Sequence, residues 1–211
     1  MTGQEPVTQH GAREPRQTPR ALTGRNLVVI SGPSGTGKTT VCRQVAERLG
    51  VRVSTSATTR PLRPGEVDGR DYYFLSEEEF RRRIADARFV EWAEVFGRLY
   101  GTPVEELARA ADAGEVLLLE IDVQGGIQIK NRFPDALAIL LLAPGLEALR
   151  CRLSLRGTEG PEEAERRFAL ATKEIEMARR AACYDAEVVN DRLDDAVGQV
   201  MQLVQTRRKQ A

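Results

Sequence analysis

The chain has 211 residues, and its 31 lysines and arginines balance its 31 aspartates and glutamates. This length suits one compact unit with an insertion better than two independent domains. The balanced charge argues against an extended basic surface for nucleic acid or an anionic membrane. No apolar run reaches the roughly 20 residues of a membrane span and no secretory signal pattern is present, so we expect a cytoplasmic protein.

The cysteine and histidine content argues against two further kinds of site, paired-cysteine metal sites and catalytic sites that depend on histidine. Cys42, Cys151 and Cys183 are odd in number and lack paired metal-ligand spacing, so we expect reduced thiols. The single histidine, His10, lies in a polar N-terminal stretch, which argues against histidine-based acid–base chemistry. That stretch, residues 1–24, has hardly an apolar side chain before its end, so we expect a disordered tail.

From residue 26 onward, short apolar runs alternate with segments of helical period. The runs cover residues 26–31, 51–56, 116–122, 138–142 and 186–190. They lack polar alternation, which is typical of strands that are covered on both faces. The pattern predicts an α/β fold with a five-stranded, mostly parallel core sheet flanked by helices.

Several helices have recognisable ends. Ser76 and Glu79 form a capping box, and Pro161 with the glutamates after it indicates the first turn of a long helix running towards Cys183. Before the C-terminus a helix carries an amphipathic stripe, which we interpret as core packing rather than a partner surface. The stripe consists of Leu193, Val197, Val200, Met201 and Val204.

The stretch "ISGPSGTGKTT", residues 30–40, matches the phosphate-binding pattern G-x-x-x-x-G-K-[ST] directly after the first predicted strand. Glycines let backbone N–H groups converge on phosphate oxygens, and the N-terminus of the next helix adds its positive dipole end. Lys38 would reach the β- and γ-phosphates, and the Thr39 hydroxyl would ligate Mg²⁺. The alternative, a glycine turn with an exposed lysine, is disfavoured by the strand–loop–helix context. The predicted ATP-binding residues here are Gly32, Pro33, Ser34, Gly35, Thr36, Gly37, Lys38, Thr39 and Thr40.

A phosphate-binding loop (P-loop) of this kind identifies the donor site only, because many enzyme classes share it. The stretch "SATTRPLRPGE", residues 56–66, follows the second predicted strand and places Arg60 and Arg63 beside prolines. Guanidinium groups bind phosphate bidentately, and ligands of open α/β sheets bind beyond the carboxyl ends of strands. The two arginines could equally form surface salt bridges, but the P-loop upstream favours a second phosphate site.

Six stretches together resemble the guanylate kinases, which transfer the γ-phosphate of ATP to GMP. They are "GPSGTGKTT", "TTRPLRPGEVDGRDYYF", "FVEWAEVFGRLYGTP", "LLLEIDVQGG", "RLSLRGTE" and "VVND", in the family's order between residues 26 and 191. The resemblance implies a P-loop kinase domain over residues 25–207. Its core is 25–56, 104–154 and 170–207, its inserted GMP-binding subdomain is 57–103, and its small lid is 155–169. ATP and GMP as substrates, Mg²⁺ as cofactor and a role in recycling GMP in purine nucleotide metabolism follow from the same resemblance.

The resemblance also assigns the acceptor site. The GMP phosphate is expected to contact Arg60, Arg63, Tyr72 and Tyr100, and the guanine base is expected to contact Ser56, Glu91 and Thr102. A carboxylate at Glu91 suits guanine, whose N1–H and 2-amino group are adjacent donors, whereas adenine offers no such pair. The apolar neighbours Phe89, Val90 and Trp92 favour partial burial of Glu91 over a solvated charge. The two tyrosines could instead be core aromatics with a hydrated hydroxyl.

Glu120 and Asp122 end the central apolar run. Two residues apart on a strand, they would share a face and point together at the site. By the resemblance, Glu120 organises Mg²⁺ through water or contacts the ribose, although relatives often have aspartate there. Asp122 is similar to a residue near the GMP base or the metal.

The lid is expected to bring arginines onto the transferred phosphoryl group. The matching positions are Arg152, Arg156 and Arg167, and Asn190 matches a residue near the adenine. Phosphoryl transfer depends mainly on positioning and charge neutralisation, here by Lys38, Mg²⁺ and these arginines, so no general base is required.

Three other functions agree less well with the sequence. A non-catalytic guanylate-kinase-like domain typically has an eroded P-loop, whereas Gly37, Lys38 and Thr39 are all present. A kinase of another acceptor, such as a phosphorylated pentose, is disfavoured by the guanine-reading set. An ATPase acting on nucleic acid would need a basic face. We therefore predict an ATP:GMP phosphotransferase, a monomer or small homo-oligomer, with no nucleic-acid or membrane partner.

Overall fold

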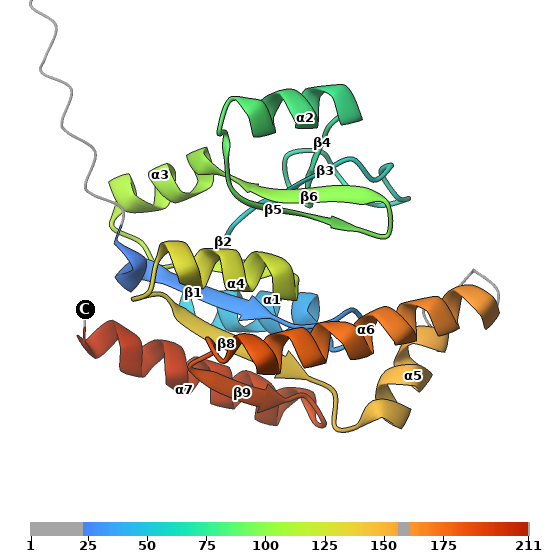
Figure 1. Cartoon of the computed structure of the whole chain (residues 1–211). Helices are drawn as coiled ribbons and strands as arrows, with labels where there is room; N and C mark the ends of the chain where they lie inside the picture. Colours follow the sequence, from blue (N-terminus) through green and yellow to red (C-terminus); the bar gives the residue numbers. More distant parts are fainter. Residues whose placement is uncertain (1–22, 156–160, 211) are drawn as a thin grey trace, which may run out of the picture.

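The computed structural model describes residues 23–155 and 161–210, which form two sheets and the helices around them (Figure 1). The larger sheet has the strand order β2-β7-β1-β8-β9, and every neighbouring pair is parallel. Its strands are β1 (Leu27–Ser31), β2 (Arg52–Val53), β7 (Leu117–Ile121), β8 (Leu137–Leu142) and β9 (Ala186–Val189). The α/β fold with a five-stranded parallel sheet is therefore confirmed.

Both faces of this sheet are covered, which explains its continuous apolar runs. On one face Val28 and Ile30 pack with α1 (Lys38–Leu49) and α7 (Leu193–Gln210). On the other, Leu27 and Val29 pack with α3 (Val104–Ala113) and α4 (Val123–Arg132). The stripe of α7 is core packing, because Val197, Val200 and Val204 are buried in the first of these layers.

The second predicted strand is shorter than the sequence suggests. β2 contains only Arg52 and Val53 of the predicted residues 51–56, and Ser54 makes a last hydrogen bond to Leu118 O at 2.9 Å. β2 is an edge strand with a single partner, and the chain leaves it here for the second sheet. The Thr55 N–H then donates to the buried carboxylate of Glu106 on α3 at 3.2 Å. Glu106 thereby holds the segment in which the chain passes from the larger sheet to the second sheet.

The second sheet lies within residues 57–103, the range expected for the insertion, and Figure 1 shows α4 between its strand β5 and β1 of the larger sheet. Its order is β4-β3-β6-β5, and α2 (Glu77–Ala85) covers it. The strands are β3 (Ala57–Thr58), β4 (Tyr73–Phe74), β5 (Phe89–Val95) and β6 (Arg98–Pro103). The Phe80 and Phe89 rings stack in its core at 4.4 Å, and the Ser76 side chain caps α2 by accepting from Glu79 N.

The remaining helices flank residues outside the described structure. α5 (Leu146–Leu155) and α6 (Pro161–Ala181) pack against each other, and α6 also packs on α4. The expected lid, 155–169, spans the end of α5 and the start of α6, and Arg156 lies outside the described residues. Most of the expected tail also lies outside them, but Gly24 is buried in a short 3-10 helix, η1 (Gly24–Asn26). A Cβ there would lie 2.8 Å from Ala136 N, so this end of the predicted tail packs on the core.

The described residues bear on the expectations for the cysteines and for membrane spans. All three cysteines lie among them and are free, with Cys42 buried and Cys151 exposed. Over the ranges 23–155 and 161–210, no helix combines the length and apolar character needed to span a bilayer.

We predict that Phe80→Ala lowers the free energy of unfolding by about 3 to 4 kcal/mol, because it removes the fully buried ring at the centre of the second sheet. Denaturant unfolding measures this change. Leu62→Ala in the same region is the control, because Leu62 is 49% exposed and its loss should cost less than about 0.5 kcal/mol. Equal effects of the two variants would contradict the assigned core.

Candidate active site

The P-loop joins β1 to α1 and has a backbone that only glycine accommodates at two positions. Gly32 has φ 154° and Gly37 has φ 89°. A Cβ on Gly32 would lie 2.2 Å from Leu141 O, and one on Gly37 would lie 2.5 Å from Asn190 Nδ2. Gly37 is the N-cap of α1 and supplies no side-chain acceptor, so the first N–H groups of the helix remain available to an anion.

Asn190 holds this loop in place. Its Nδ2 donates to Thr36 O at 2.8 Å, and its own backbone N–H donates to Leu142 O at 2.8 Å. The Thr36 hydroxyl donates to Pro33 O at 3.0 Å, and Arg152 on α5 donates to Asn190 O at 2.8 Å. The structure thus gives Asn190, expected near an adenine, a contact that supports the loop backbone.

Two P-loop side chains carry groups suited to phosphate and metal, an ammonium and a hydroxyl. Lys38 Nζ donates to Gly32 O at 2.6 Å and to Pro33 O at 3.0 Å. The Thr39 hydroxyl donates to Glu120 Oε1 at 2.5 Å, which brings β7 against the loop. A hydroxyl beside a carboxylate is a hard oxygen pair and fits Mg²⁺, which keeps several waters and binds through few protein ligands.

A cavity of about 240 Å³ joins the P-loop to the second sheet. The predicted residues that line it are Gly32, Ser34, Gly35, Gly37, Lys38, Thr39, Ser56, Arg63, Tyr72, Glu91, Tyr100, Glu120 and Asp122. The other described candidates are not part of this lining; they are Pro33, Thr36, Thr40, Arg60, Thr102, Arg152, Arg167 and Asn190. Donor and acceptor candidates therefore face one space.

Glu91 is a buried carboxylate rather than a solvated charge. Its exposed fraction is 4%, and it accepts a hydrogen bond from the Thr102 hydroxyl at 2.7 Å across the β5–β6 pair. Burial raises the pKa of Glu91 to about 7, and the nearby Asp122 also raises it. Gly125 on α4 leaves room for the carboxylate, because a Cβ there would lie 2.5 Å from Glu91 Oε2. The site thus presents a fixed acceptor that adjacent donors could satisfy.

The two arginines of residues 56–66 have different environments. Arg60 is paired with Glu66 through two hydrogen bonds of 2.7 and 3.0 Å, and its guanidinium lies 5.4 Å from the Tyr72 ring centre. Arg63 lines the cavity, while its backbone N–H donates to Glu66 at 2.8 Å. Glu66 thereby holds both arginines on one turn.

Tyr72 and Tyr100 both line the cavity. The Tyr72 and Tyr100 rings meet edge to face, with centres 6.1 Å apart. Burial, together with the charge of Glu120, raises the pKa of Tyr72 to about 12. Tyr72 therefore remains a hydroxyl donor at neutral pH.

Glu120 and Asp122 both border the cavity, as expected, but the expectation that both lie on the strand is wrong for Asp122. β7 ends at Ile121, and Asp122 is the N-cap of α4, where its carboxylate accepts from Gly125 N at 3.0 Å. The chain turns from strand to helix at this point, so the alternation of a strand no longer applies. Asp122 still borders the cavity, but its carboxylate is committed to capping α4.

The described lid arginines surround the site without lining its cavity. Arg167 on α6 pairs with Glu163 at 3.4 Å and lies 5.7 Å from the ring centre of Phe96. Phe96 is at the β5–β6 turn and lines the cavity. The first turns of α6 thus contact the tip of the second sheet.

Sequence reasoning missed Glu66, Phe96 and Glu174. Glu174 is 5% exposed and lines the cavity beside the P-loop. A charge on the apolar face of a long helix, between Ala171 and Ala178, was the available signal for it. Glu66 ends the arginine-containing stretch itself, but its partner could not be identified without the fold.

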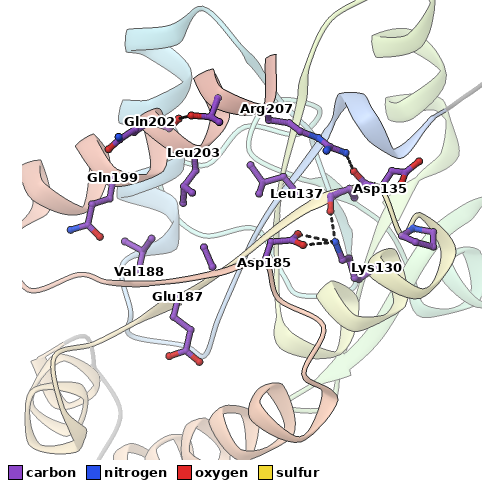
Figure 2. Close-up of a pocket in the computed structure, with 14 residues that line it drawn as sticks. Lys130, Asp135, Leu137, Asp185, Glu187, Val188, Gln199, Gln202, Leu203 and Arg207 are labelled. Carbon is purple, nitrogen blue, oxygen red and sulfur yellow. Dashed lines mark hydrogen bonds and ion pairs between the residues drawn. The ribbon is translucent and has the colours of Figure 1, made fainter. Parts of the chain in front are cut away.

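A larger cavity of about 680 Å³ lies elsewhere, between α7, β9 and the start of β8 (Figure 2). None of the predicted site residues lines it. Lys130 is paired with Asp185 at 2.8 Å and also donates to Ala136 O, while Arg207 donates to Asp135 O (Figure 2). These cations are already satisfied by the protein, so the smaller cavity at the P-loop is the better candidate.

Comparison with known proteins agrees with this arrangement. The family model described as "Guanylate kinase" matches residues 24–207. The chain belongs to the guanylate kinase family. The guanylate kinase of Gloeobacter violaceus is 51% identical over 179 residues, which cover 84% of this chain and 86% of that protein. The guanylate kinase of Symbiobacterium thermophilum is 45% identical over 183 residues, covering 86% and 85%.

A solved guanylate kinase has a similar fold. The crystal structure of guanylate kinase from Anaplasma phagocytophilum matches with a TM-score of 0.70 at 30% identity, covering 85% of this chain and 84% of that one. The resemblance that the six sequence stretches suggested is thus confirmed.

We predict that Glu91→Gln stabilises the protein more at pH 8 than at pH 5. Folding raises the pKa of Glu91 from 4.5 to about 7, so the stability gained from its neutral form is lost as pH rises through about 7. Glutamine stays neutral and keeps an acceptor for Thr102. The difference in free energy of unfolding between variant and wild type should grow by about 2 to 3 kcal/mol over this range. Denaturant unfolding at the two pH values tests this, and a constant difference would contradict it.

Proposed function

We propose that the protein transfers the γ-phosphate of ATP to GMP, giving ADP and GDP, and so recycles GMP in purine nucleotide metabolism. The observation that carries the proposal is the shared cavity, lined by Lys38 of the P-loop on one side and by the buried Glu91 on the other. The loop suits the phosphates of a nucleotide donor. The buried carboxylate can accept two adjacent N–H groups, as guanine presents them, so the pair fits a kinase that phosphorylates a guanine nucleotide.

The donor side supports ATP binding through the residues predicted from the sequence. Backbone N–H groups at the N-terminus of α1 would bind the phosphates, and Lys38 would move from the Gly32 and Pro33 carbonyls to the β- and γ-phosphates. Thr39 and Glu120 would hold Mg²⁺. Bound there with ATP, the metal would neutralise phosphate charge.

Selection of guanine follows from the burial of Glu91. Its carboxylate, held by Thr102, would accept N1–H and the 2-amino group together, with Ser56 at the same cavity. Adenine would leave this buried carboxylate without donors, and such a mismatch can discriminate by about 10⁴-fold. This geometry favours GMP over a phosphorylated sugar as the acceptor.

The phosphate of GMP would lie at the other end of the cavity. Arg63, Tyr72 and Tyr100 line this end, and Arg60 is held against Tyr72 by Glu66. Two guanidinium groups and two phenol hydroxyls suit a dianion.

Transfer itself would rest on positioning and charge neutralisation. Lys38 and the lid arginines Arg152, Arg156 and Arg167 are the groups proposed for this. Closure of the subdomain 57–103 and the lid 155–169 would exclude water and so prevent hydrolysis of ATP. The core segments 25–56, 104–154 and 170–207 would form the fixed frame. A cytoplasmic location and a monomer or small homo-oligomer stay predictions.

We predict that a coupled assay of ADP release shows strong turnover with GMP and little with AMP, dTMP or UMP, because only guanine presents the donor pair that suits Glu91. Initial rates at equal acceptor concentrations measure the preference. Strong turnover with AMP and none with GMP would contradict the assignment of the base site.

We predict different defects for the two sides of the cavity. Lys38→Ala should lower kcat by at least about 10³-fold, because it removes a charge from the transferring phosphoryl group. Glu91→Ala should mainly raise KM for GMP and weaken the selectivity against AMP. Glu94→Ala is the matched control, because Glu94 is an exposed carboxylate on the same strand. Unchanged KM and selectivity in Glu91→Ala would refute its role.

A further inference from the structure

β5, the strand that carries Glu91, stands at the end of the second sheet, whose strand order is β4-β3-β6-β5. One edge of β5 pairs with β6, and the strand also packs against α4 of the core (Figure 1). The outer edge of such a strand presents backbone N–H and C=O groups that need hydrogen-bond partners. Two side chains of α4 supply partners, and the groups that they bind flank Glu91.

Gln128 makes the first of these contacts with both halves of its amide. Its Nε2 donates to Trp92 O at 2.8 Å, and its Oε1 accepts from Trp92 N at 3.4 Å. A carboxamide carries the same donor and acceptor as a peptide group. Gln128 thus binds Trp92 as a residue of a neighbouring strand would.

Arg132 holds the same strand two residues earlier. Its Nη1 donates to Val90 O at 3.2 Å. The register between β5 and β6 shifts between Phe89 and Glu91, so the ladder is irregular just before Glu91. Contacts from α4 therefore hold the backbone at the residue before Glu91 and at the residue after it.

The same face of α4 also meets the Glu91 side chain. Gly125, Gln128 and Arg132 share this face, because they are spaced at i, i+3 and i+7 on the helix. A Cβ on Gly125 would lie 2.5 Å from Glu91 Oε2, while Thr102 on β6 donates to Oε1 at 2.7 Å. The carboxylate thus lies between α4 and β6, and its place depends on how closely β5 is held to α4.

Gln128 is exposed, so water can replace its hydrogen bonds and little stability depends on them. Water cannot replace the fixed separation of α4 and β5 that the two-way contact with Trp92 sets. Loss of this contact should therefore affect the placement of Glu91 more than it affects folding.

We propose that Gln128 is a positioning residue for guanine recognition, which holds β5 against α4 so that the Glu91 carboxylate meets N1–H and the 2-amino group together. The inference rests on the proposed kinase function. It implies weaker binding and poorer selection of GMP but an unchanged affinity for ATP, because the P-loop joins β1 to α1 and receives no contact from Gln128 among the hydrogen bonds of the described residues.

The experiment measures KM for ATP, for GMP and for inosine monophosphate, whose base lacks the 2-amino group, in Gln128→Met. Methionine keeps the length and helix propensity of glutamine but lacks its donor and acceptor pair. The control is Asn131→Ala, which removes an exposed amide from the same helix.

Gln128→Met should raise KM for GMP by about fivefold or more and lower the preference for GMP over inosine monophosphate by about threefold or more. KM for ATP should stay within about twofold, and the thermal midpoint should fall by less than about 4 °C. Wild-type KM for GMP, equal weakening of both acceptors, or a fall in the midpoint of about 10 °C would overturn the proposal.

A double-mutant cycle with Glu91→Ala tests the route of the effect. If Gln128 acts through Glu91, adding Gln128→Met to Glu91→Ala should raise KM for GMP by less than about twofold. A further rise of about fivefold in that background would overturn the proposal. Absence of GMP turnover by the wild type refutes the proposed function instead, and the cycle is then run with the acceptor that the wild type does phosphorylate.

Discussion

The backbone of the P-loop is the constraint on which the rest of the site depends. Gly32 and Gly37 have positive φ angles, and neighbouring backbone or side-chain atoms leave no space for a Cβ at either position. The loop can therefore turn its N–H groups towards an anion only while its surroundings hold it. Asn190 supplies that support from the end of β9, and Arg152 fixes Asn190 from α5. Segments more than 100 residues away in the sequence thus maintain a loop whose residue types are locally specified.

Two buried carboxylates face this loop across the cavity, and both carry an electrostatic cost. Burial raises the pKa of Glu91 and of Glu174 to about 7. Glu91 lies on the second sheet and Glu174 lies on α6, and both line the cavity. Buried charges of this kind are expected where a ligand or a positioned backbone supplies the donors. Glu91 is the one proposed to select the substrate.

The sequence predicted the parts of this structure that depend on local pattern. Glycine spacing located the P-loop, continuous apolar runs located the strands of the larger sheet, and the cap at Ser76 located a helix start. Prediction from the sequence failed where the position or partner of a side chain depends on tertiary structure. Asp122 lies one residue beyond the strand on which it was placed, and the partner of Arg60 is Glu66, which is near in sequence but identified only by the folded turn. Glu174 was missed because its place beside the P-loop follows only from the packing of α6, although its charge on an apolar helix face was a local signal.

The most direct test of the central claim, that one cavity aligns ATP with GMP, is a crystal structure with GMP and a non-hydrolysable ATP analogue bound. The guanine edge should lie on Glu91 and Thr102, and the GMP phosphate should lie on Arg60 and Arg63. The analogue's phosphates should lie on the P-loop, with the γ-phosphate in line with an oxygen of the GMP phosphate. GMP bound away from Glu91, or in the cavity between α7 and β9, would contradict it.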